Sequence, residues 1–65
     1  MKLHFVLIFE SKDGLGELRT VTETLSGEDL EKRMTSIIEL YNKRVHEAWK
    51  LIAFSHTFLS ADMHL

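Results

Sequence analysis

Histidine side chains give this sequence its widest chemical range, because they can bind metals and transfer protons near neutral pH. The chain has four: His4, His46, His56 and His64. No two of them have the H-x3-H spacing of a helical zinc site, and there is no cysteine to complete one. His4 and His56 are expected on neighbouring strands, where they could share one face of a sheet. We interpret them as hydrogen-bonding residues of a sheet surface or dimer contact, and we predict no metal and no cofactor.

Three acidic residues, Glu28, Asp29 and Glu31, cluster in the middle of the chain. They fall where a helix is expected to begin, and carboxylates there interact favourably with the helix dipole. The interpretation that we favour is therefore structural. The alternative is an acidic patch that binds a basic region of a protein partner.

Nucleophiles and phosphate-binding loops have little support in the sequence. No serine lies in a G-x-S-x-G context, and the segment DGLG lacks the spacing of a phosphate-binding loop. Two glycines after an aspartate are instead typical of a hairpin turn. We therefore predict no catalytic residue and a protein that is not an enzyme.

A small basic and aromatic patch is the remaining candidate site, and it would bind nucleic acid. Its residues are Tyr41, Lys43, Arg44 and Lys50, with Trp49 nearby. Exposed aromatic rings can stack on single-stranded bases. However, eight basic and ten acidic residues give a net charge of −2, whereas nucleic-acid-binding domains usually carry excess positive charge. Nucleic-acid binding is thus the alternative function.

The first element that must position these residues is a strand over residues 2–11. KLHFVLIF is apolar on both sides, with Leu3, Phe5, Leu7 and Phe9 on one face and Val6 and Ile8 on the other. Such a run indicates a central strand that is covered on both faces, or a strand whose second face contacts a partner. The DGLG turn leads to a second, threonine-rich strand over residues 17–25. Because that strand is more polar, we place it at an edge of the sheet.

A helix is predicted over residues 27–44. Ser26 is the expected N-cap, Asp29 lies three residues later, and Leu25 and Leu30 would form a hydrophobic staple. Apolar residues at helical spacing form one stripe, namely Leu30, Met34, Ile37, Ile38, Tyr41 and Val45. This stripe should pack on a sheet.

The segment 47–59 is predicted as a third strand, with a helix as the competing interpretation. Regular alternation would turn Trp49, Leu51 and Ala53 to one face, and Ile52, Phe54, His56 and Phe58 to the other. Residues 60–65 are expected to form a short C-terminal tail after a single domain of residues 1–59.

These elements predict an α+β fold with the order ββαβ and a three-stranded sheet of order 2-1-3. The long crossover through the helix would allow the third strand to lie parallel to its neighbour. One helix covers only one face, so apolar residues on the other face would be left bare. The expected interface residues are Val6, Ile8, Trp49, Ile52, Phe54 and Phe58. We expect a homodimer, sheet on sheet or edge to edge, or docking on another protein.

Sixty-five residues without cysteine form a marginal domain, which usually needs a metal or a partner chain for stability. No apolar run reaches the length of a membrane span, and ESKDG is a poor signal-peptide cleavage site, so we expect a cytoplasmic protein without a membrane partner. The layout of hairpin, helix and strand is similar to that of several very small phage-encoded inhibitors, including some uracil-DNA glycosylase inhibitors and anti-CRISPR proteins. That resemblance implies an interaction module that inhibits or adapts a larger protein.

Overall fold

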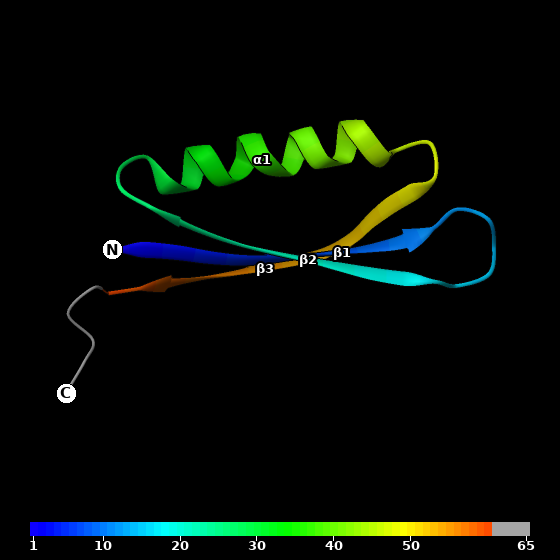
Figure 1. The fold of residues 1–65 in the computed structure, drawn as a ribbon, viewed down its shortest axis with the longest axis horizontal. Helices are drawn as coiled ribbons and strands as arrows, with labels where there is room; N and C mark the ends of the chain where they lie inside the picture. The colour runs from blue at the N-terminus through cyan, green and yellow to red at the C-terminus, as the bar shows by residue number, and fades with distance from the viewer. Residues whose placement is uncertain (61–65) are drawn as a thin grey trace.

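The computed structural model describes residues 1–60 as one sheet and one helix (Figure 1). In chain order the elements are β1 (Lys2–Ser11), β2 (Leu18–Ser26), α1 (Leu30–Val45) and β3 (Trp49–Leu59). The sheet has the order β2-β1-β3, with α1 on one of its faces. The predicted α+β fold and strand order are confirmed, and residues 49–59 form a strand rather than a helix. Residues 61–65 of the expected tail lie outside the described part of the chain.

The direction of β3 differs from the expectation. Both outer strands pair with β1 in the antiparallel sense, so a parallel neighbour for β3 was wrong. The reason is the path of the helix. Since β2 ends beside the start of β1, α1 returns the chain to the other end of the sheet, and β3 must run back along β1 (Figure 1).

The hydrophobic core lies between α1 and the face of β1 that carries the odd-numbered residues. Leu3, Phe5 and Leu7 are 0% exposed, and Phe9 is 3% exposed. Leu30 and Met34 of the helix complete the buried set within the described residues. Half-buried side chains from β2, α1 and β3 surround this core: Val21, Leu25, Ile37, Ile38, Tyr41, Val45, Trp49 and Leu51. The predicted helix stripe therefore packs on the predicted face of β1.

The start of the helix was predicted incorrectly. Residue 29 is the N-cap instead of Ser26, its φ of 53° is in the left-handed region, and its side chain makes no capping hydrogen bond. Gly27 also has a positive φ, of 104°, so the chain makes a tight turn before α1 begins. The Arg33 guanidinium closes this turn by donating to the carbonyls of Ser26 (2.8 Å) and Glu28 (3.2 Å). The side chain of Arg33, the fourth residue of the helix, thus replaces the expected capping box.

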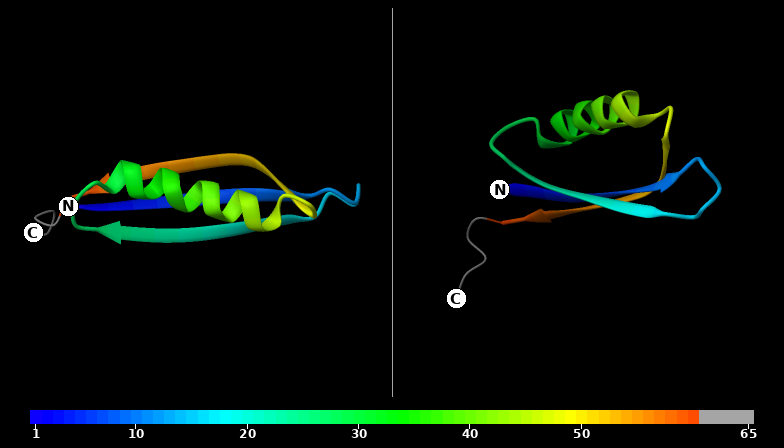
Figure 2. Two further views of the ribbon diagram at one scale, coloured as in Figure 1. Left: turned by 90° about the horizontal axis from the view of Figure 1, so that it is seen from above. Right: turned by 45° about the vertical axis from the view of Figure 1, so that its right-hand side comes forward.

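The helix crosses the sheet obliquely, as the view from above shows (Figure 2, left). Near its start it lies toward β3, where Leu30 and Glu31 line a hollow together with Phe58. Near its end it lies over β2, where Tyr41 and Val45 line a hollow with Val21. Consequently the middle of β3 has no helix above it.

Candidate interaction surface

A β-bulge in β3 changes which side chains face the helix. Ile52 has no partner on β1, while Leu51 pairs with Phe9 and Ala53 with Ile8. Because directly paired residues of neighbouring strands point to the same face, the alternation shifts by one residue at Ile52. Leu51 and Phe54 therefore both lie on the helix face of the sheet.

The shift corrects the predicted faces of the third strand. Phe54, His56 and Phe58 pair with Leu7, Phe5 and Leu3, so they lie on the helix face. The expectation that they share the bare face with Val6 and Ile8 was wrong, because regular alternation cannot anticipate a bulge. Ala53, Ser55, Thr57 and Leu59 occupy the bare face instead.

Residues 52–59 of β3 are exposed along their whole length, on both faces. Phe54 is 52% exposed although its partner Leu7 is fully buried, and Phe58 is 38% exposed beside the fully buried Leu3. The cause is the oblique helix, which covers β1 and leaves the middle of β3 uncovered. Ile52 and Leu59 are 46% and 41% exposed. Within residues 1–60, the outer edge of β3 is therefore an apolar strand without cover.

Three rings form a row on this strand, and we call Phe54, His56 and Phe58 the aromatic row. The Phe54 and His56 rings are stacked with centroids 6.3 Å apart, and the His56 and Phe58 rings meet edge to face at 6.1 Å. His56 was not among the expected interface residues. The sequence signal for His56 is the alternating F-x-H-x-F pattern, in which it occupies the central position between the two phenylalanines.

The bare face of the sheet is less apolar than expected. Val6 and Ile8 lie on it and are half-buried, because hydroxyl and small side chains flank them on both sides. These flanking residues are Thr20 and Thr22 on β2 and Ala53 and Ser55 on β3. His4 also lies on this face, where its Nδ1 is 2.9 Å from Oγ1 of Thr24. His4 and His56 are thus on opposite faces, and the expectation that they share one was wrong.

Trp49 is part of the packed structure rather than a free anchor. Its half-buried indole packs against the core at the end near Phe9. The Arg19 guanidinium of β2 lies over the ring, 4.9 Å from its centroid, a cation–π contact. Of the six expected interface residues, Ile52, Phe54 and Phe58 are the ones that the structure leaves exposed.

The acidic residues Glu28, Asp29 and Glu31 are exposed around the start of α1. Glu31 and Lys32 line a shallow hollow of about 470 Å³ with Phe58 and Met1. The acidic cluster thus borders one end of the aromatic row formed by Phe54, His56 and Phe58. No other feature of the cluster among the described residues indicates a binding site.

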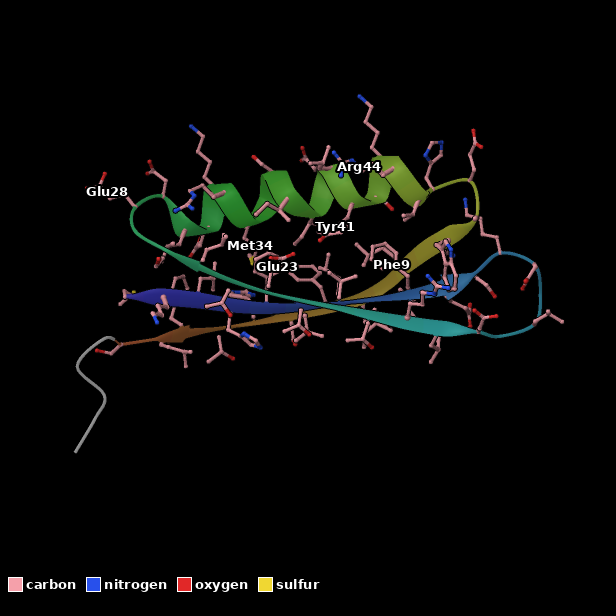
Figure 3. The ribbon with its side chains drawn as sticks, in the orientation of Figure 1. Phe9, Glu23, Glu28, Met34, Tyr41 and Arg44 are labelled. Atoms are coloured by element: carbon pink, nitrogen blue, oxygen red, sulfur yellow. The ribbon has the colours of Figure 1, made fainter. Side chains whose placement is uncertain are left out.

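The predicted basic and aromatic patch is not one surface. Tyr41 points from the helix toward Glu23 of β2 (Figure 3), and its hydroxyl donates to Oε1 of Glu23 at 2.8 Å. This hydrogen bond, with burial as a smaller cause, raises the pKa of Tyr41 above its usual value. Lys50 pairs with Glu10 and so lies on the bare face, away from the helix that carries Lys43 and Arg44.

Residues 1–60 contain no group of three or more histidine or acidic side chains arranged to hold a metal ion. In the same part of the chain, no helix is both long and apolar enough to cross a membrane. The feature that remains is the uncovered edge of β3 with its aromatic row.

Comparison with known proteins finds no match to any family model, any curated protein or any solved structure.

Proposed function

We propose that this protein is a small, non-enzymatic interaction module that binds an extended protein segment along the outer edge of β3. The observation that supports this proposal most directly is the run of eight exposed residues, 52–59, on an eleven-residue edge strand. Residues 51–60 carry no lysine, arginine, aspartate or glutamate, although such charges normally protect an edge from pairing.

The binding mode that fits this edge is strand addition. Alternate residues of an edge strand turn their backbone N–H and C=O groups outward, where an added strand can pair with them. Backbone pairing provides affinity, and side-chain contacts on alternate residues provide specificity. Here the aromatic row offers Phe54 and Phe58 to the added strand, and aromatic residues often contribute most of the binding energy of an interface.

Binding of this kind would let so short a chain act on a larger protein. A strand taken from the partner is held in a fixed conformation, so the partner is inhibited or joined to a second protein. Of the exposed acidic residues at the start of α1, Asp29 and Glu31 line a hollow with Phe58, and Glu28 precedes them in the chain. They would favour a partner segment with basic residues at that end.

A peptide selection tests the proposal. The purified full chain, immobilised at low density, is used to select binders from a displayed library of random dodecapeptides. We expect peptides with apolar residues at alternate positions, and we expect them to slow amide hydrogen exchange in residues 52–59. Phe54→Lys should weaken binding at least about tenfold, because a charge enters an apolar contact.

Leu18→Lys is the matched control for Phe54→Lys. Leu18 lies on the other edge strand and is 58% exposed, close to the 52% of Phe54. The control should leave peptide binding unchanged. If the selected peptides bind both variants equally well, or protect amides elsewhere in the chain, strand addition at β3 is wrong.

A further inference from the structure

We infer that a second copy of this chain occupies the edge of β3, in an antiparallel pairing centred on His56. This inference rests on the proposed function and names its partner. The dimer would have a continuous six-stranded sheet, order β2-β1-β3-β3-β1-β2, with both helices on the same face. A two-fold axis would pass through the sheet between the two copies of His56, so the interface is closed and self-complementary.

The alternation of β3 determines which pairings are allowed. Beyond the bulge, residues 53–59 alternate regularly between the two faces. Two copies related by this axis keep their helix faces together, so helix-face residues must pair with helix-face residues. Centring the pairing on His56 places Phe54 of each copy opposite Phe58 of the other, since each lies two residues from His56.

This register pairs phenylalanine rings with one another across the interface, which the registers shifted by one residue do not do. It joins two rows of three rings into one array in which four phenylalanine rings form two cross-strand pairs. Moving the centre by one residue to Ser55 or Thr57 would instead place Phe54 or Phe58 opposite His56. On the bare face the same register pairs Ser55 with Thr57 and Ala53 with Leu59, which are small or compatible side chains.

The absence of charge on β3 also favours a copy of this chain as the partner. Two identical strands bring like residues close together, and like charges on paired strands repel each other. Residues 51–60 contain no lysine, arginine, aspartate or glutamate, so no such repulsion arises from them. The exposed parts of Phe54 and Phe58 are modest, which favours a weak association with a dissociation constant of roughly tens of micromolar.

A cysteine scan tests the register, because the natural chain contains no cysteine. Single cysteines are placed at 54, 55, 56, 57 and 58, and disulfide formation between copies is followed under mild oxidation. Circular dichroism confirms that each variant folds. We expect the fastest linkage for His56→Cys and slower linkage on either side. Faster linkage at another of these positions would overturn the register, and faster linkage for Val6→Cys would overturn the edge pairing in favour of the bare face.

A charge exchange tests the pairing of Phe54 with Phe58. Sedimentation of the wild-type chain from 1 to 200 µM should show a monomer–dimer equilibrium. Phe54→Lys and Phe58→Glu should each raise the dissociation constant at least about tenfold, and a mixture of the two should form a heterodimer. In that heterodimer one lysine faces one glutamate, while the unchanged Phe58 and Phe54 remain paired.

The outcomes separate this inference from the proposed function. A wild-type chain that stays monomeric at 200 µM, or a mixture that does not associate more strongly than either variant alone, overturns the dimer. Peptides that still bind β3 of a monomeric chain would leave strand addition in place, with another protein as the partner. Leu18→Lys is the control variant, and its dissociation constant for the dimer should equal that of the wild-type chain.

Discussion

The two outer strands of the sheet, β2 and β3, flank the same central strand, yet their helix-face residues are buried to different extents. On β2, the helix-face residues Val21, Glu23 and Leu25 are half-buried, and Val21 and Leu25 pack against the core. On β3, the helix-face residues Phe54, His56 and Phe58 are exposed. A strand that looks more polar in the sequence is thus the better covered one.

One side-chain contact ties the end of the helix to β2, because Tyr41 donates a hydrogen bond to Glu23. A second contact ties β2 to β3 across the end of the core, where Arg19 lies over Trp49. The two charged residues of β2, Arg19 and Glu23, also act as the usual protection of an edge. The fold thus covers one outer strand with the helix and gives it charged residues, whereas it leaves residues 52–59 of the other outer strand exposed.

The largest expected effect comes from the strand that both edges share. Phe5→Ala should lower the free energy of unfolding by about 3–5 kcal/mol, because Phe5 is 0% exposed and its removal leaves a cavity in the core. Phe54→Ala should cost less than about 1 kcal/mol at 1 µM protein, where the chain is expected to be monomeric. Chemical denaturation measures both. Equal losses would show that β3 is covered as fully as β1.

A smaller effect should come from the contact that ties α1 to β2. Tyr41→Phe removes one partly buried hydrogen bond and should cost about 1 kcal/mol at neutral pH. Glu23→Gln should leave a weaker hydrogen bond and cost less. An unchanged stability in Tyr41→Phe would show that Glu23 does not hold the helix.

The same contact predicts a dependence of stability on alkaline pH. Because the Glu23 hydrogen bond raises the pKa of Tyr41 in the folded state, folding favours the neutral phenol. Its contribution to stability is fully present below the unfolded-state pKa of about 10, and is lost as the pH rises through the higher folded-state pKa. Tyr41 is the only tyrosine, so its absorbance near 295 nm reports the titration directly. Glu23→Gln should move the midpoint to lower pH.

The cation–π contact between Arg19 and Trp49 should contribute still less. Arg19→Ala should reduce stability by about 0.5–1 kcal/mol, since this contact lies near the surface. Trp49 is the only tryptophan, so its fluorescence should change when the guanidinium is removed. Lys50→Ala is the control on the adjacent residue. Equal fluorescence changes in the two variants would contradict a specific contact.

The smallest expected effect on stability comes from placing a charged residue on β3, where it would oppose strand pairing as the charges of β2 do. Ser55→Lys places a charge on the bare face of the exposed strand and should change the free energy of unfolding by less than about 0.5 kcal/mol at 1 µM. It should nevertheless weaken association at higher concentration, because an edge lysine opposes strand pairing. A large loss of stability in the dilute protein would show that Ser55 is packed.

Local pattern was sufficient to predict much of the fold. The doubly apolar run in β1, the glycines after Asp13 and the apolar stripe of α1 each have a period or a turn signal of their own. They led to the strand order β2-β1-β3 and to the odd-numbered residues of β1 as the core. The helix start was missed because Arg33 replaces the capping side chain, and this depends on a turn built from two positive-φ residues.

The pattern of apolar residues indicates an α+β sheet with one helix, and it contains more apolar side chains than a single helix can cover. Where the uncovered apolar side chains lie depends on the packing of the strands and the helix. The bulge at Ile52 moves Phe54 and Phe58 to the helix face, and the oblique helix leaves them uncovered there. Both depend on how strands and helix pack against one another, which no local period of the sequence encodes.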